Sequence, residues 1–422
     1  MTPRFLSRWS LWILRLTRRL WLRVTLFALL AVGTAALAIL VEGLLPEALS
    51  RRVTEAAVLP ILTILASGML AVSTFSLNVM VTAHNAAAGQ TTPRVHRVLL
   101  ADTTTHTVLA TFIGAFVYAL SAIILFKAGA YPAGAAVIVL AITVAVVVLV
   151  VLALLRWIHH LSDLGSLDAT LATIEAATRP CLMRARHLPA LGAEVLGPDT
   201  VLPDAARAIP APATGHVQVI DMPGLHALCK ETGTRLYLYA RPGDYVVEGK
   251  TIGHAAGPRD VSPEAIARRL TISAHRSFDQ DAGYGLLVLS ETAARALSPG
   301  INDPGTAIGV IERLERLLLD WARAQPREAA PLFAGVFLPD TSREALIENA
   351  FAQAARDGAG QIEVAERLRA ALLRLSDVPD PALAAAARGM AARALDHAEA
   401  ALSLESERAR LRATGNGISF LS

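Results

Sequence analysis

Four apolar segments in the first 158 residues constrain this chain more than any other feature. They cover residues 24–41, 61–83, 106–126 and 135–155, and each has roughly the 20 residues that an α-helix needs to cross the hydrocarbon core of a bilayer. The composition agrees, since 54% of residues are hydrophobic and only 18% are charged, which is unusual for a soluble chain. We therefore expect residues 24–158 to form a four-helix transmembrane domain in the lipid bilayer, followed by a soluble body.

The arginines indicate how these segments are oriented. They gather before the first segment, between the second and third, and after the fourth, at Arg4, Arg8, Arg15, Arg18, Arg19, Arg23, Arg94, Arg97, Arg156, Arg179, Arg184 and Arg186. Because basic flanks stay in the cytoplasm, we expect a multi-pass protein of the bacterial inner membrane with both termini cytoplasmic. The first apolar run is longer than a typical signal-peptide core, so we expect a retained anchor. Residues 1–23 carry tryptophans among the arginines and are expected to form a basic amphipathic helix.

One face of the second apolar segment is small and polar. At a helical spacing of about 100° per residue, its members fall within one arc. They are Thr63, Ser67, Ala71, Thr74, Asn78, Thr82 and Asn85. Lipid cannot satisfy the Asn78 carboxamide, so this face must meet protein or water. It could pack against another helix, because small residues allow close approach, or it could line an aqueous path with Thr74 and Asn78 at the constriction.

The soluble part is expected to be an α+β body with four parts. Residues 159–212 read as a connecting helix and a linker, and residues 213–257 alternate like the strands of a small β-rich module. A Pro-Gly-Asp turn in that module is similar to those of barrel-sandwich modules of the lipoyl type, but their modified lysine is missing, so no cofactor is expected. Residues 258–412 have helical spacing, with a loose tail at 413–422. The net charge of +3 argues against binding to nucleic acid.

Two polar blocks within the predicted helical part are the most distinctive stretches of the chain. They contribute Arg276, Asp279, Gln280, Asp281, Arg295, Ser298, Pro299, Gly300, Asn302, Asp303 and Pro304. Pro299 and Gly300 predict a turn, and Asn302 or Asp303 is placed to cap a helix that begins at Pro304.

The charged members of these blocks have two further interpretations. One is a buried charged cluster that braces the module against the fourth apolar helix or another subunit, formed by Arg276, Asp279, Asp281, Arg295 and Asp303. The other, a weaker one, is a carboxylate metal site formed by Asp279, Asp281 and Asp303.

These blocks resemble the signature of a widespread bacterial family of predicted inner-membrane proteins, catalogued as a domain of unknown function. The run Leu-Ser-Pro-Gly-Ile-Asn-Asp-Pro at 297–304 is its most specific part. The resemblance extends to the Thr-Phe-Ser-Leu run at 74–77, to Pro93 and Arg94, and to the strands near Gly215 and Gly243. It implies a membrane location and a similar architecture, and it implies no known activity.

Three functions are compatible with these features. The first is an oligomeric channel or transport protein for an ion or small solute, regulated by its cytoplasmic body, with copies meeting at the polar face of the second segment. The alternative is a non-conducting scaffold whose body binds partner proteins. The third is a membrane-anchored, metal-dependent hydrolase. No nucleophile lies beside a base in the sequence, so a non-enzymatic function is expected.

Overall fold

The computed structural model describes residues 53–90, 92–95, 103–129, 131, 135–163, 166–259, 261–326 and 330–414, together with single positions at 22, 25, 29 and 33. The chain divides between residues 170 and 171 into two compact units, which we call the membrane unit and the body. The predicted segments 1–23 and 24–41 and most of the tail 413–422 lie outside the described residues.

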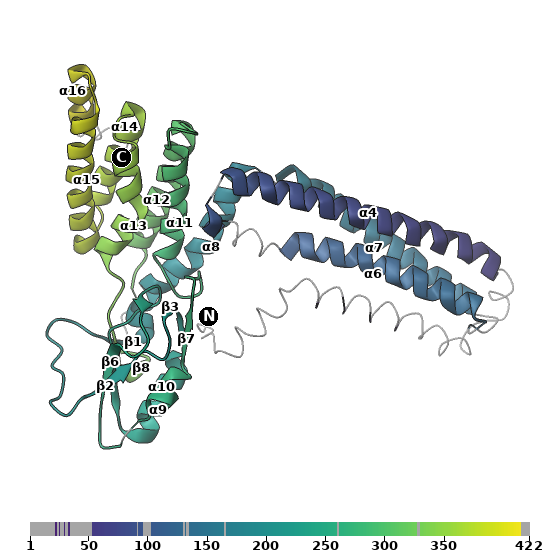
Figure 1. Cartoon of the computed structure of the whole chain (residues 1–422), viewed down its shortest axis with the longest axis horizontal. Helices are drawn as coiled ribbons and strands as arrows, with labels where there is room; N and C mark the ends of the chain where they lie inside the picture. The colour runs from purple at the N-terminus through teal and green to yellow at the C-terminus, as the bar shows by residue number, and fades with distance from the viewer. Residues whose placement is uncertain are drawn as a thin grey trace. The chain divides into compact units, whose positions relative to one another are not determined.

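Within its described residues, the membrane unit contains three helices that are long and apolar enough to cross a membrane. They are α4 (Glu55–Gln90), α6 (Thr103–Lys127) and α7 (Ala135–Asp163), and they match the predicted segments at 61–83, 106–126 and 135–155 (Figure 1). Helix α6 packs against both α4 and α7. The Tyr118 hydroxyl of α6 joins it to α7 by a 3.0 Å hydrogen bond with Thr143 Oγ1.

The body contains two sheets in its described residues. Their strands are β1 (Ala193–Val195), β2 (Arg207–Pro210), β3 (Gly215–Ile220), β4 (Arg235–Leu238), β5 (Tyr245–Val246), β6 (Thr251–Ala256), β7 (Leu270–Ser273) and β8 (Phe333–Leu338). The larger sheet has the order β1-β8-β4-β6-β2, with β8 parallel to both β1 and β4 and with antiparallel pairing of β6 to β4 and β2. In the smaller sheet, β3 pairs antiparallel with β5 and β7.

A helix separates strands that the sequence suggested would belong to one module. Helix α9 (Met222–Thr232) lies between β3 and β4 in the chain. It begins because Asp221 accepts a hydrogen bond from the Gly224 backbone N–H, and it ends at Gly233 in a left-handed conformation with φ of 70°. Strands β3 and β4 consequently belong to different sheets, and a barrel-sandwich module is not confirmed.

The strands also extend beyond residues 213–257. Strands β1 and β2 lie in the stretch that the sequence suggested was a linker, and β7 and β8 lie in the stretch expected to be helical. Strands β1 and β2 have three and four residues, too few to show an alternating pattern. Their pairing with β8 and β6 is long-range, so it could not be read from local sequence.

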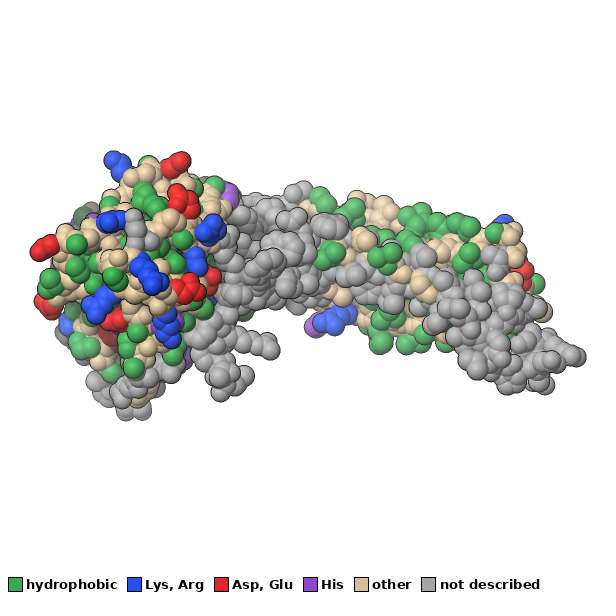
Figure 2. Space-filling model, turned by 90° about the horizontal axis from the view of Figure 1, so that it is seen from below, with side chains coloured by type: hydrophobic (Ala, Val, Ile, Leu, Met, Phe, Trp, Pro, Cys, Tyr) green, Lys and Arg blue, Asp and Glu red, His purple; other side chains and the backbone are tan. Residues whose placement is uncertain are grey.

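The remaining helices of the body are largely gathered into a bundle. They are α8 (Leu167–His187), a short 3-10 turn η2 (Pro189–Gly192), α10 (Pro263–Ala267), α11 (Tyr284–Ala296), α12 (Pro304–Arg323), α13 (Arg343–Asp357), α14 (Ile362–Ser376), α15 (Pro381–Ala401) and α16 (Glu405–Ala413). Helices α11 to α15 pack side by side, as Figure 1 shows. Acidic and basic side chains are scattered over the body, whereas the described face of the membrane unit in Figure 2 is mostly apolar or uncharged.

Candidate functional site

The polar face of α4 points away from the other described membrane helices. The opposite face of α4 carries Leu62, Leu65 and Met69, which are buried in the core shared with α6. The polar face is exposed at each predicted position whose side chain the structure describes: Thr63, Ser67, Thr74, Asn78 and Thr82. The Asn85 side chain lies outside the described part. The polar face therefore does not serve to pack α4 against α6 or α7.

The hydroxyl groups of this face bond to their own helix. Thr63, Thr74 and Thr82 each donate to the backbone carbonyl four residues earlier, at 2.9, 3.0 and 2.9 Å, and Ser67 donates to the Thr63 carbonyl at 2.9 Å. Such bonds satisfy the hydroxyl donors without water. The Asn78 carboxamide has no hydrogen-bond partner among the described residues, so it is the group on this face that most needs one.

The Ser298–Pro304 part of the signature forms the connection between α11 and α12. Asp303 caps α12 by accepting a 3.0 Å hydrogen bond from the Thr306 backbone N–H, and Pro304 occupies the first turn. The hydrogen bonds from Thr306 lower the pKa of Asp303. Asn302 has a positive φ of 51° and accepts a 3.0 Å hydrogen bond from Gln361 Nε2. Helix capping and loop geometry account for these residues.

The Arg276–Asp281 part of the other block forms a buried ion pair. Arg276 donates from Nε and Nη2 to the two carboxylate oxygens of Asp281, at 2.7 and 2.9 Å. Asp281 also accepts from the Gly283 and Tyr284 backbone N–H groups, at 3.2 and 3.1 Å. Burial raises the pKa of Asp281, although these four bonds act in the opposite direction. The arrangement fixes the loop that begins α11.

Three glycines around this pair are required by close contacts. A Cβ on Gly243, whose φ is 98°, would overlap the Asp281 carboxylate, and a Cβ on Gly285 would overlap the Thr178 side chain. A Cβ on Gly283 would lie 2.6 Å from Asn349 Nδ2. These glycines bring the β4–β5 loop, α8 and α13 against the start of α11.

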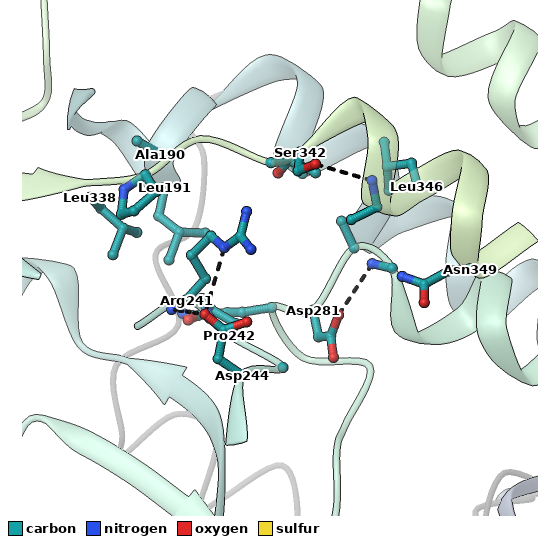
Figure 3. Close-up of a pocket in the computed structure, with 18 of the residues that line it drawn as sticks. Ala190, Leu191, Arg241, Pro242, Asp244, Asp281, Leu338, Ser342, Leu346 and Asn349 are labelled. Atoms are coloured by element: carbon teal, nitrogen blue, oxygen red, sulfur yellow. Dashed lines mark hydrogen bonds and ion pairs between the residues drawn. The ribbon is translucent and has the colours of Figure 1, made fainter. Parts of the chain in front are cut away.

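A cavity of about 230 Å³ opens beside this ion pair. Figure 3 shows its walls, which come from the β4–β5 loop with Arg241 and Asp244, from the loop before α11 with Asp281, and from α13 with Asn349 and its N-cap Ser342. The signature residues Arg276, Gln280 and Asp281 all line it. The cavity is therefore where two stretches singled out from the sequence, near 243 and near 281, come together.

The two ion pairs of the cavity differ in their exposure to solvent. The side chains of Arg276 and Asp281 are 19% and 4% exposed. Arg241 Nε lies 3.6 Å from Asp244 Oδ2, and these two side chains are 33% and 39% exposed. Arg276 and Asp281 are thus the more buried ion pair of the lining, and Arg241 and Asp244 are the more exposed one.

Backbone strain is concentrated on the wall that η2 forms. Ala190 and Leu191 have positive φ values of 48° and 57°, and both line the cavity. Non-glycine residues in this region cost about 1–3 kcal/mol each and cluster at functional sites. The Ala190 backbone N–H donates to Asp340 Oδ1 at 3.2 Å, which helps to hold this conformation.

The structure does not bring the three predicted metal-binding carboxylates together as one site. Asp279 accepts a 2.9 Å hydrogen bond from Ser277 Oγ, Asp281 is paired with Arg276, and Asp303 caps α12. Within the described ranges no group of three or more His, Cys, Asp and Glu side chains could hold a metal ion. Of the predicted charged cluster, Arg276 and Asp281 are joined directly, whereas Asp303 has the separate role of a cap.

Several residues of the cavity were not identified from the sequence. Asn349 belongs to α13 and Ser342 lies directly before it, in the stretch 258–412 for which only helical spacing was predicted, and Ala190 and Leu191 belong to the stretch expected to be a linker. Ser342 caps α13, so a Ser before a helical pattern was a signal for the helix start. No local signal indicated that α13 would lie beside the loop at 241–244.

A second cavity, of about 260 Å³, lies beside β2 and β6. Its lining contains Arg207, Thr234 and Arg259, and none of the residues singled out from the sequence. The cavity at Arg276 and Asp281 is therefore the stronger candidate for a site in the body.

Comparison with known proteins places the chain in a family. A family model described as "Predicted membrane protein (DUF2254)" matches residues 17–374. Uncharacterized proteins of Mycobacterium bovis and Mycobacterium tuberculosis are each 28% identical over 251 residues, covering 57% of this chain and 47% of the relative. The chain thus spans about half the length of the curated relatives it matches. No solved structure matches it. Because the family model covers most of the chain, the protein belongs to this family of predicted membrane proteins.

Proposed function

We propose that the protein is an oligomeric channel or transport protein of the bacterial inner membrane, with both termini cytoplasmic. The orientation follows from the arginines that flank the apolar segments. The observation that carries the proposal is the position of the polar face of α4. It is exposed on the membrane unit, while the opposite face of α4 is used for packing on α6.

The Asn78 side chain limits what can surround the polar face of α4. A carboxamide exposed to lipid would lose its hydrogen bonds with water, at a cost of several kcal/mol. The polar face has apolar neighbours on both sides, since Ile64, Leu70 and Phe75 are 72%, 53% and 63% exposed. A polar strip between lipid-compatible side chains suits a position at which several copies of α4 meet around a path for an ion or small solute. In this proposal the body regulates conduction.

A second function is favoured by a different observation. Each hydroxyl of Thr63, Ser67, Thr74 and Thr82 donates to its own helix, so these residues do not require water and could pack tightly against another helix. The protein would then be a non-conducting scaffold whose body binds partner proteins. Asn78 would in that case form a hydrogen bond between copies.

Conductance measurements separate the two functions. The full-length protein is reconstituted in planar bilayers and compared with Asn78→Leu and with the control Val79→Leu, whose position lies outside the polar face. We expect discrete currents that Asn78→Leu alters and Val79→Leu leaves unchanged. A folded oligomer that stays silent across salts, voltages and membrane tension would contradict the channel. If Asn78→Leu then changed the oligomeric state, the scaffold would be supported.

A further inference from the structure

The cavity in the body carries balanced charges. Its charged lining residues are Arg241, Asp244, Arg276 and Asp281, two cations and two anions. A bound anion would be attracted by the two arginines but repelled by the two carboxylates. A bound cation would be attracted by the carboxylates but repelled by the arginines. A ligand with one charge of each sign complements both. The charge balance therefore favours a dipolar molecule.

The hydrogen bonds that each charged group already makes indicate which groups are available to bind the two ends of such a ligand. Asp281 already accepts four hydrogen bonds, so it has little capacity left for a ligand. Asp244 Oδ2 accepts from the Arg241 backbone N–H at 2.9 Å, whereas nothing in the described chain bonds to Oδ1. Asp244 is therefore the acceptor available for an ammonium group.

The arginines supply the complementary donors. Arg276 uses Nε and Nη2 for Asp281, and Arg241 uses Nη1 for the Asp340 backbone carbonyl, at 3.3 Å. In the described structure Nη1 of Arg276 and Nη2 of Arg241 have no hydrogen-bond partner. Guanidinium groups bind carboxylates through such N–H groups. The Asn349 carboxamide, which also has no partner among the described residues, adds a neutral donor and acceptor to the wall.

The size of the cavity limits the ligand to a small molecule. Its volume of about 230 Å³ is below the roughly 300–1,000 Å³ of pockets for drug-sized ligands. We propose that this cavity binds a small dipolar solute with a carboxylate and an ammonium group, that is, an amino-acid-like molecule. Arg276 and Arg241 bind its carboxylate, and Asp244 binds its ammonium group. The site does not depend on whether the membrane unit conducts.

Isothermal titration calorimetry on the full-length protein in detergent tests this site. The probes are γ-aminobutyrate and its single-charge analogues butyrate and butylammonium, with glycine and β-alanine as shorter dipolar probes. We expect at least one dipolar probe to bind. Butyrate and butylammonium should bind at least on the order of tenfold more weakly than that probe, because each lacks one charged contact. Equal binding of butyrate would show an anion site and overturn the proposal, as would no binding of any dipolar probe.

Two variants connect binding to the named residues. Asp244→Asn keeps an acceptor for the Arg241 backbone N–H but removes the charge, and Arg241→Gln removes a carboxylate donor. Each is expected to weaken binding of the dipolar probe on the order of tenfold or more. Asp357→Asn is the matched control, since Asp357 pairs with Arg356 on the surface of α13, away from the cavity lining. Unchanged affinity in both cavity variants, with an intact circular dichroism spectrum, would show that the ligand lies elsewhere.

Discussion

The polar face of α4 in the membrane unit and the charge clusters of the body satisfy their polar groups in different ways. In α4 the hydroxyls of Thr63, Thr74 and Thr82 bond to carbonyls one turn away. In the body, Glu175 of α8 bonds to Arg316 of α12, 141 residues later, at 2.7 and 3.0 Å. Hydrogen bonds within one helix do not determine which helix packs against it, whereas long-range charge pairs determine which helices pack together. The outer face of α4 is therefore suited to contacts beyond one chain, and the helices of the body are fixed within it.

The body contains two such charge clusters on α12. Arg313 and Arg316 bind Glu175, and Arg367 and Arg374 of α14 bind Glu315, which is 4% exposed. Burial alone would raise the pKa of Glu315, but its hydrogen bonds to Arg374 and Arg367 outweigh burial and lower it. Helix α12 is thus held on one side by α8 and on the other by α14.

The largest effect is expected from removing the Glu315 carboxylate. Glu315→Gln leaves Arg367 and Arg374 without a buried anion, and we expect a loss of about 3 kcal/mol in the free energy of unfolding of the body. Hydrogen exchange of α12 and α14 peptides in the full-length protein measures it. Glu312→Gln is the matched control, because Glu312 also binds Arg367 but its side chain is 51% exposed, and its loss should stay below about 1 kcal/mol. Equal losses would contradict the role of burial.

A smaller effect is expected where α8 and α11 approach closely. Gly285→Ala would place a methyl group on the Thr178 side chain, and overpacking of this kind costs roughly 1–3 kcal/mol. The matched control is Gly309→Ala in α12, where no atom lies within 4 Å of the added Cβ; it should stabilise the body slightly. Thermal unfolding compares them. If overlap with the Thr178 side chain causes the loss, adding Thr178→Ala should partly restore the stability of Gly285→Ala. No recovery of stability in the double variant would contradict this close contact.

The smallest expected effect is a difference in pH dependence between the units. The pKa values of Glu175 and Glu315 are below the ordinary 4.5, since their arginine hydrogen bonds outweigh burial. Their stabilisation is complete above that value and is lost as the pH falls through the folded-state pKa values. Asp281, whose pKa is raised, acts in the opposite sense.

The body should therefore lose stability as the pH falls below 4.5 and through the folded-state pKa values of the two carboxylates, while the helicity of α4 persists, because its hydroxyl bonds do not titrate. Circular dichroism and limited proteolysis over this range distinguish the units. Glu315→Gln should reduce this loss of stability. If the stability of that variant depended on pH as steeply as that of the unmodified protein, Glu315 would not be responsible for the loss.

The same contrast explains what could be predicted from the sequence. The apolar length of 61–83 and the spacing of its polar residues are local, and the helix and the presence of a polar face on it follow from them, whereas the neighbour of that face does not. The cap at Asp303 is also local, since Pro304 and the helical pattern follow it directly. The cavity is not local: Asp281, Asp244 and Asn349 are brought together by sheet pairing and by contacts at Gly243 and Gly283.

The most direct test of the central proposal is the access of water to Asn78. The two native cysteines permit a cysteine scan, because burial raises the pKa of Cys181 to about 12 and of Cys229 to about 11, which keeps both thiols unreactive. Asn78→Cys is compared with Leu77→Cys, which lies at nearly the same depth and is also exposed.

In reconstituted vesicles, a charged, membrane-impermeant thiol reagent should modify Asn78→Cys quickly and Leu77→Cys slowly, because position 78 faces water and position 77 faces lipid if α4 lines a path. Equally slow modification of both positions would contradict an aqueous path along α4.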